Sequence, residues 1–176
     1  IFGLYIRHLT FWTLAGSIGL GGFYALLCFS ADHAPGWIVA TTWQLTIIAT
    51  LVVLRGFGQT FHRSIWFFST IVFFGVLLVN LSAVEAQSAK GLLTGGLPVL
   101  IAAFCYPVGN QLVWEAQHGH RRLPMIDDPY GENPFAKVLL LALGSVPFWL
   151  ALLAVVWPPL PSAGQLVNTG LVALFS

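Results

Sequence analysis

The stretch "GLPVLIAAFCYPVGNQLVWEA", residues 96 to 116, is the part of the sequence that decides the fold. Most of it is Leu, Val, Ile, Ala and Phe, and such a helix would have no polar face to turn toward water. Tyr106, Pro107, Asn110 and Gln111 nevertheless lie close together near its end. Polar side chains surrounded by hydrocarbon need partners, so they normally face other helices or a water-filled cavity. The stretch therefore predicts a membrane helix with one polar side.

The composition of the whole chain agrees with a membrane setting. Hydrophobic residues make up 57% of it and charged residues 7%, and its mean hydropathy is +0.85. Soluble domains carry about 25% charged residues, and without them a globule in water would expose large apolar patches. The net charge is only +1, with no basic patch outside the loops, which excludes nucleic acid as a partner. The composition predicts that the lipid bilayer surrounds this protein.

Runs without charge divide the chain into spans, since a helix that crosses the hydrocarbon needs roughly 20 mostly apolar residues. The length of these runs, with Leu and Ala throughout, favours helices over barrel strands. The predicted spans are 9–31, 36–54, 65–84, 91–114 and 138–157, and a sixth run, 166–176, covers part of a crossing. The predicted fold class is all-α, a polytopic transmembrane helix bundle. Because the last run stops inside an apolar segment, we expect a fragment of a longer protein.

The positive charges predict the orientation of the spans, because cytoplasmic loops of membrane proteins carry an excess of Lys and Arg. One set of alternate loops holds Arg7, Arg55, Arg63, Arg121, Arg122 and Lys137, and the other set holds only Lys90. The first span is therefore predicted to start in the cytoplasm, and the loop from Glu115 to Lys137 to be cytoplasmic. This pattern is typical of a multi-pass protein of the inner, cytoplasmic membrane.

Polar and aromatic residues within the spans mark a candidate site. Each of them alone is explained by hydrogen bonds between helices, which contribute about 0.5–2 kcal/mol per contact. Taken together, they favour a polar and aromatic cavity that accepts a small-molecule solute. The residues predicted to line its pathway, as substrate-binding residues, are Tyr24, Trp43, Gln44, Tyr106 and Asn110.

Proline and glycine add to this prediction. Pro107 removes a backbone donor and frees a carbonyl near Ala103, which membrane helices tolerate beside a cavity or another hydrogen-bonding group. The helical period places Tyr106, Pro107 and Asn110 on one stripe. In the first span, the small residues that offer an open face to another helix are Gly16, Gly19, Gly21 and Gly22. Interrupted polar helices beside close-packed glycines are typical of transporters.

The hydrophilic loop offers a competing hypothesis. It contains His118, His120, Asp127 and Asp128, which would suit an integral-membrane enzyme that acts on lipid. Metal sites need ligands at fixed distances, and a loop rich in Pro and Gly does not fix them by itself. We therefore interpret the loop as a solvated connector and predict no metal, no cofactor and no catalytic residues. A non-transporting membrane scaffold is a third hypothesis. A bound metal would favour the enzyme, and a water-accessible cavity between the second and fourth spans would favour the transporter.

Two segments carry a resemblance to a known family. "FYALLCFSADHAPGWIVATTWQ" (23–44) and "PVLIAAFCYPVGN" (98–110) resemble the multidrug resistance efflux transporter family of the drug/metabolite transporter superfamily. The resemblance extends from about Phe11 to Ser176. It implies a ten-helix protein built from two inverted five-helix halves, with 1–90 as the end of the first half and 91–176 as the start of the second. It also implies a transporter that moves a small organic or drug-like solute by alternating access, in the direction of efflux.

The acidic residues depart from the pattern of one branch of that superfamily. The small multidrug resistance branch uses a membrane-embedded glutamate in its first helix to exchange protons for cationic drugs. The corresponding helix here is 91–114, and its nearest acid, Glu115, comes at the cytoplasmic end, while Asp32 lies at the end of another span. Proton coupling through a mid-membrane carboxylate is therefore not predicted within this chain. Coupling to a proton or another ion through other helices stays open.

Overall fold

A computed structural model describes residues 1–176 apart from 83–88, 120–125, 127–132, 158 and 176. This described part contains helices and no strand, which confirms the predicted all-α class. In chain order its elements are α1 (Phe2–Arg7), α2 (Leu9–Gly16), the π-helical turn η1 (Ser17–Gly22), α3 (Phe23–His33), α4 (Gly36–Trp43), α5 (Thr46–Gly56), α6 (Arg63–Ser82), α7 (Ala89–His118), α8 (Pro134–Val156) and α9 (Ala163–Phe175).

Within the described residues, four helical segments are long and apolar enough to cross a membrane. They are Leu9–His33, Gly36–Gly56, Leu93–His118 and Pro134–Val156, close to the predicted first, second, fourth and fifth spans. The predicted third span corresponds to α6, in which the apolar stretch Arg63–Val79 is shorter. The protein is therefore a multi-pass membrane protein. The ten-helix arrangement of two halves stays a prediction.

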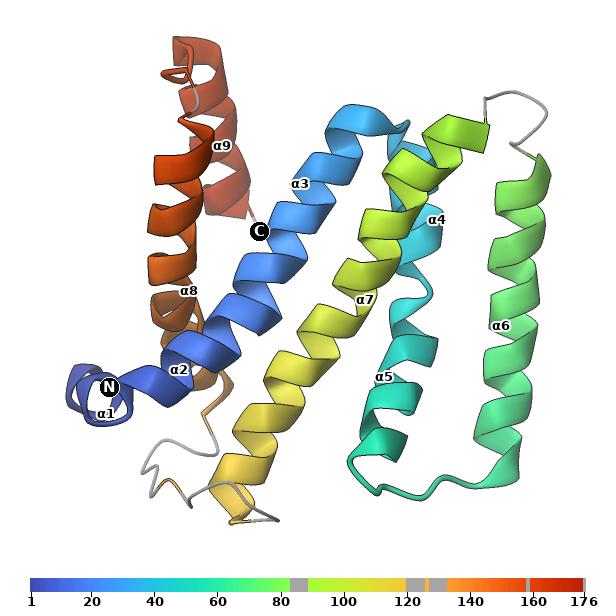
Figure 1. Cartoon of the computed structure of the whole chain (residues 1–176), viewed down its shortest axis with the longest axis horizontal. Coiled ribbons are helices and arrows are strands. Elements are labelled where there is room, and N and C mark those ends of the chain that lie inside the picture. Colours follow the sequence, from blue (N-terminus) through green and yellow to red (C-terminus); the bar gives the residue numbers. More distant parts are fainter. Residues whose placement is uncertain (83–88, 120–125, 127–132, 158, 176) are drawn as a thin grey trace.

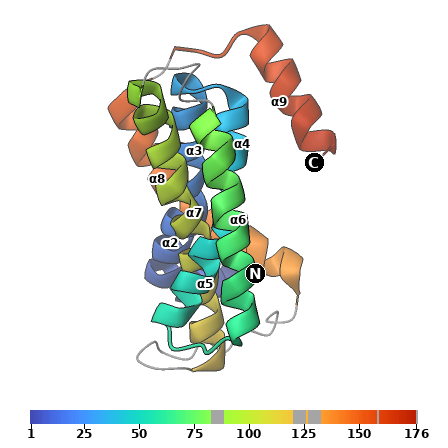
Figure 2. The same ribbon diagram turned by 90° about the vertical axis from the view of Figure 1, so that its right-hand side faces the viewer.

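Helix α7 lies in the middle of the bundle (Figure 1). It packs against η1 and α3 on one side and against α4 and α5 on the other, while α8 packs against α2 and η1. Helix α6 is outermost, beyond α4 and α5. Figure 2 shows that α9 stands away from the other helices, and the described side chains of α9 are all exposed. Residues of α7 are thus in reach of both the first and the second span.

Glycines let the helices approach closely at two places. A Cβ atom added to Gly16 would lie 2.6 Å from the carbonyl carbon of Gly144 in α8. A Cβ added to Gly19 would lie 3.0 Å from the Cα of Gly109 in α7. Such contacts are tighter than a side chain allows, so the predicted glycine face of the first span is confirmed. The glycines contact two different helices, however, because Gly16 faces α8 and Gly19 faces α7.

The start of α8 is fixed by local sequence. The Oδ1 atom of Asn133 accepts hydrogen bonds from the backbone N–H groups of Phe135 (3.0 Å) and Ala136 (3.3 Å). Pro134 follows as the first helical residue, where its missing N–H costs nothing. This N-cap sets the point at which the chain leaves the hydrophilic loop and enters the next span.

The described positive charges that were assigned to the cytoplasm lie at one end of the bundle. Arg55 is in the last turn of α5, Arg63 begins α6, and Lys137 is in the first turn of α8, all at the end where the α5–α6 connection lies (Figure 1). Arg7 ends α1, which precedes the first span at that same end. The fold therefore gathers charges that are distant in the sequence, as the orientation prediction requires.

We expect cysteines placed at Gln59 and Gly119 to react with a membrane-impermeant thiol reagent only from the cytoplasm. A cysteine placed at Gln87, which lies outside the described residues, should react only from the opposite side. The reason is the excess of Lys and Arg in cytoplasmic loops. The measurement compares the labelling of each introduced cysteine in intact cells with its labelling in inside-out vesicles. It uses full-length protein whose native cysteines have been replaced by alanine. Labelling at Gln59 and Gln87 from the same side would contradict the span assignment.

Candidate functional site

Three of the predicted pathway residues meet around one phenylalanine. The ring of Phe23, at the start of α3, is 4% exposed. Its centroid lies 5.0 Å from that of Tyr24, 5.5 Å from that of Trp43 in α4 and 5.5 Å from that of Tyr106 in α7. These separations fall within the range at which aromatic pairs attract one another. We call Phe23, Tyr24, Trp43 and Tyr106 the aromatic cluster; it joins three spans.

The outer rings of the aromatic cluster are only half covered. Tyr24 is 49% exposed, Trp43 45% and Tyr106 44%, whereas the central Phe23 is buried. Each outer ring thus keeps a flat apolar surface free for contact, and the two tyrosines add a hydroxyl at the edge. An arrangement of this kind can hold an apolar or aromatic group and recognise one polar substituent.

The helical backbone is irregular in two of the spans beside the aromatic cluster, and the third span contains a proline. The π-helical turn η1 ends at Gly22, directly before Phe23. The second span is interrupted at Gln44 and Leu45, directly after Trp43, because α4 ends there and α5 begins at Thr46. In α7, Pro107 follows Tyr106 and is buried. π-Helical turns and interrupted helices occur frequently at functional sites of membrane proteins.

The two predicted carboxamides occupy different positions. Asn110 is exposed, one turn beyond Tyr106, and its Nδ2 donates to the carbonyl oxygen of Tyr106 at 3.1 Å. Gln44 is exposed at the interruption of the second span, next to Trp43 in the chain. Asn110 therefore adjoins the aromatic cluster through its own helix, and Gln44 through its chain neighbour.

Three hydroxyl groups of the second span form hydrogen bonds within that span. Thr41 donates to the carbonyl of Trp37 at 2.9 Å, Thr46 to that of Trp43 at 2.6 Å, and Thr50 to that of Thr46 at 2.7 Å. Ser and Thr that bond back in this way often bend helices. These three threonines are thus explained by the local backbone around the interruption.

Bonds between helices come from other residues. The hydroxyl of Ser30 in α3 donates to the carbonyl of Gly95 in α7, and the hydroxyl of Tyr5 in α1 donates to that of Leu143 in α8 at 3.3 Å. These contacts fix the outer end of α3 and the start of the chain against their neighbours.

A buried pair on α7 was missed by the sequence interpretation. Glu115 is 1% exposed and Gln111 5%, and the Nε2 of Gln111 donates to the Oε1 of Glu115 at 3.0 Å. Glu115 is predicted from the sequence to lie at the end of a span, and its burial is not predicted. The spacing of four residues between Gln and Glu was the available signal, since it puts both side chains on one helix face. Glu115 lies nine residues beyond Tyr106, about 13 Å along the helix.

Of the four residues named in the enzyme hypothesis, the structure describes His118. The exposed His118 stacks on Trp114 with ring centroids 4.4 Å apart, and its Nδ1 lies 2.9 Å from the carbonyl oxygen of Trp114. His120, Asp127 and Asp128 lie outside the described residues. Among the residues that are described, no group of three or more His, Cys, Asp or Glu side chains could hold a metal ion.

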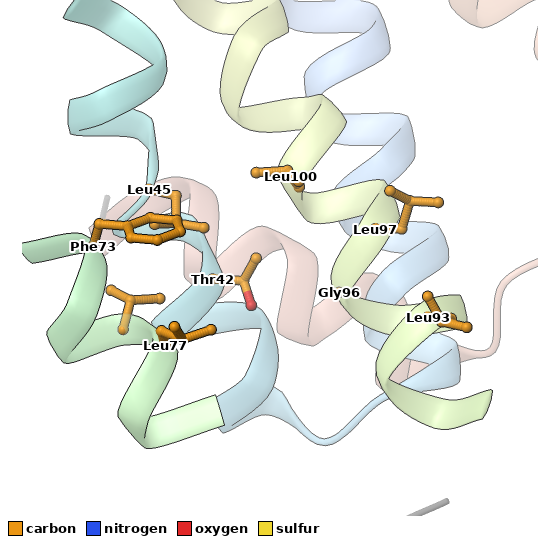
Figure 3. A pocket seen from close by; sticks show the side chains of 9 residues that line it. Thr42, Leu45, Phe73, Leu77, Leu93, Gly96, Leu97 and Leu100 are labelled. Atoms are coloured by element: carbon orange, nitrogen blue, oxygen red, sulfur yellow. The ribbon is translucent and has the colours of Figure 1, made fainter. Parts of the chain in front are cut away.

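An apolar pocket with a volume of about 270 Å³ lies between α4, α6 and α7 (Figure 3). The pocket lies between the second and fourth spans, where a water-accessible cavity would favour the transporter, but almost all of its wall is apolar. None of the five predicted pathway residues lines it. Its lining residues are Thr42, Leu45, Phe73, Val76, Leu77, Leu93, Gly96, Leu97 and Leu100.

Apolar spans that pack around a half-exposed aromatic cluster define the class of this protein as a helical, multi-pass membrane protein. The chain matches, over residues 1–176, the family EmrE, described as "Putative multidrug resistance efflux transporter". A match over the whole chain shows that the protein belongs to this family, as the resemblance of its two segments predicted.

Two bacterial proteins are similar to this chain. The "Uncharacterized protein YjlA" of Bacillus subtilis (strain 168) is 35% identical over 94% of the chain and 52% of its own length. The "Uncharacterized 42.1 kDa protein in intracellular alkaline protease 3'region" of Shouchella clausii is 34% identical over 90% of the chain and 42% of its own length. The chain therefore spans about half the length of these relatives. No solved structure matches it significantly.

Proposed function

We propose that the protein exports a small organic solute across the cytoplasmic membrane by alternating access, and that the aromatic cluster with Gln44 and Asn110 forms part of the solute pathway. The chain supplies the end of one five-helix half (1–90) and the start of the other (91–176). The direction of transport rests on the family description.

The meeting of three spans at one aromatic cluster is the observation that carries this proposal. Phe23 follows η1, Trp43 precedes the interruption of the second span, and Tyr106 precedes Pro107. Interrupted helices change conformation at lower cost than continuous ones, because some of their backbone hydrogen bonds are already absent. A solute held by Trp43 would therefore touch the part of the second span that can move.

The chemistry of the aromatic cluster suggests the kind of solute. Half-exposed rings favour a flat apolar body, and the hydroxyl of Tyr106 with the carboxamides of Asn110 and Gln44 offers hydrogen bonds to one polar group. The described residues beside the cluster carry no charge, so discrimination would depend on shape and hydrogen bonding. Coupling of transport to a proton or another ion is compatible with this proposal.

We expect Trp43→Ala to reduce uptake of aromatic solutes into inside-out vesicles that contain the full-length protein. One lost aromatic contact of about 0.5–1.5 kcal/mol would raise the apparent KM roughly two- to tenfold. The solutes are an aromatic cation, a neutral aromatic compound and an aromatic acid, each measured against vesicles without the protein. Trp66→Ala is the matched control, because Trp66 is 37% exposed and lies in α6, away from the aromatic cluster.

Equal KM values in the Trp43 and Trp66 variants, with both proteins folded, would remove the aromatic cluster from the solute pathway. Absence of uptake by the wild-type protein for all three solutes would contradict transport of this solute class.

A further inference from the structure

The first and fourth spans pack along one another in opposite directions. The turn η1 and helix α3 of the first span both contact α7 (Figure 1). In the proposed transporter, η1 and α3 belong to the half 1–90 and α7 belongs to the half 91–176. Alternating access in transporters built from two such halves is largely a rocking of one half against the other. If the proposed function holds, on which this inference rests, the contact between α3 and α7 must change during transport.

The backbones of these two spans touch at Gly19 in η1 and Gly109 in α7. A Cβ atom added to Gly109 would lie 2.9 Å from the backbone nitrogen of Gly19 and 3.0 Å from the carbonyl oxygen of Ala15. Neither glycine has a side chain that could interlock with the other helix, so the two can turn on each other while their backbones stay in contact. Bending is also eased on both sides, because Gly19 belongs to a π-helical turn and Pro107 precedes Gly109 by two residues.

The aromatic cluster lies about one helical turn from this glycine contact, on its outer side. There the ring centroids of Phe23 in α3 and Tyr106 in α7 are 5.5 Å apart. At the same level, a Cβ atom added to Gly22 would lie 3.6 Å from the Sγ atom of Cys105. Separation of α3 from α7 on the outer side of the glycines would therefore part Phe23 from Tyr106 and admit a solute to the aromatic cluster.

A buried hydrogen bond joins the two helices at their outer end. The hydroxyl of Ser30, which is 0% exposed, donates to the carbonyl oxygen of Gly95 in α7. Beside this bond, Ala34 packs so closely that a Cβ atom added to Gly95 would overlap its Cβ atom. Burial of Ser30 does not depend on the rest of the protein, because additional segments can only cover it further. The contact between α3 and α7 is therefore closed on the outer side in this structure.

We propose that the contact between α3 and α7 is the outer gate of the solute pathway. Gly19 and Gly109 form its pivot, and the hydrogen bond from Ser30 to Gly95 holds it closed. Gly95 lies about 21 Å along α7 from Gly109. A rotation of about 15°, similar to that of subunits in allosteric proteins, would move the outer end by about 5 Å. Such a movement breaks the bond of Ser30 and opens the aromatic cluster, while the pivot stays intact.

Cys105 provides a native reporter of this gate, because it lies in the contact between the two spans at the level of the aromatic cluster. The test uses full-length protein in which every other cysteine, Cys28 included, has been replaced by alanine. The rate at which a membrane-impermeant thiol reagent modifies Cys105 is measured from the outside in intact cells and from the cytoplasmic side in inside-out vesicles. The measurement needs no solute, so it does not depend on which solute the protein moves.

Ser30→Ala deletes the donor and should raise the rate of modification from the outside roughly fivefold, without raising the rate from the cytoplasmic side. Ser69→Ala is the matched control and should leave both rates unchanged. Ser69 in α6 is also buried, but its hydroxyl donates to the carbonyl of Ile65 in its own helix, at 2.8 Å. Gly95→Ala acts on the same contact by a different route and should also raise the outside rate, because its Cβ atom would push Ala34 away.

Equal outside rates in the folded Ser30 and Ser69 variants would overturn the outer gate, and so would a Cys105 that no variant exposes to the outside. A rise of the same size from both sides would also overturn it, because the substitution would then loosen the protein as a whole. If these results occur while the wild-type protein takes up an aromatic solute, the gate fails and the proposed function stands. A faster outside rate in Ser30→Ala, together with no uptake of any tested solute, would contradict the proposed function instead.

Discussion

Replacement of Gly144 by alanine is expected to prevent α8 from packing against the first span. The added Cβ would overlap the carbonyl oxygen of Trp12 and lie 2.7 Å from its carbonyl carbon. Both atoms belong to the backbone of α2, so no side chain can rotate away to make room. Overpacking costs about 1–3 kcal/mol where side chains can adjust, and we expect at least the upper value here. That corresponds to a decrease of several degrees in the melting temperature of the full-length protein.

The measurement is the thermal stability of the full-length protein in detergent. The loss of its monodisperse peak in size-exclusion chromatography is recorded as the temperature is raised. Gly75→Ala is the control, because a Cβ atom there meets nothing within 4 Å and alanine favours the helix. The control should be as stable as the wild type or slightly more stable. Equal melting temperatures for the two variants would contradict the close packing of α2 and α8.

Replacement of the two neighbouring carboxamide residues of α7 by leucine is expected to have opposite effects on thermal stability and on transport. Gln111 is 5% exposed and donates to the buried carboxyl group of Glu115. Gln111→Leu deletes this donor, and a buried group that loses a hydrogen bond costs about 1–3 kcal/mol. Gln111→Leu should therefore lower thermal stability, while solute affinity in the surviving folded protein stays unchanged.

Asn110→Leu is the contrasting change, one residue earlier. Asn110 is exposed, and its described hydrogen bond goes to the carbonyl of Tyr106 in its own helix. Its replacement should preserve membrane insertion and stability but weaken uptake of solutes with a polar group, because a donor and an acceptor are lost beside the aromatic cluster. Stability and solute affinity are measured on one preparation of each variant. Reduced stability with unchanged affinity for Asn110→Leu would make Asn110 a structural residue and remove it from the site.

The positions of the spans could be predicted from the sequence because they follow from the solvent. Each polar or charged group that is left in hydrocarbon is costly, so the ends of apolar runs mark the ends of helices within a few residues. The predicted run 36–54 and the observed Gly36–Gly56 illustrate this agreement. The close approach of other helices to the first span could also be predicted from its glycines. The absence of a Cβ atom is a property of the residue itself and does not depend on its neighbours.

Which helices and side chains pack against each other was decided by the tertiary structure. Nothing in the sequence indicates that Gly16 faces α8 while Gly19, one turn later, faces α7. Phe23 could not be singled out among many phenylalanines, although three predicted pathway residues surround it. Burial of Glu115 likewise depends on the helices beside it, because its place near the end of a span is compatible with exposure.

The sequence by itself therefore determined the class of fold, four of the spans and the side of the bundle that carries the positive charges, since these depend on one residue and its solvent. Only the tertiary structure decided which aromatic rings meet, that Gln111 and Glu115 are buried, and that an apolar pocket separates α6 from α7. Such features depend on how residues distant in the chain pack together, and that packing is set by the shapes of whole helices rather than by the pattern along any one of them.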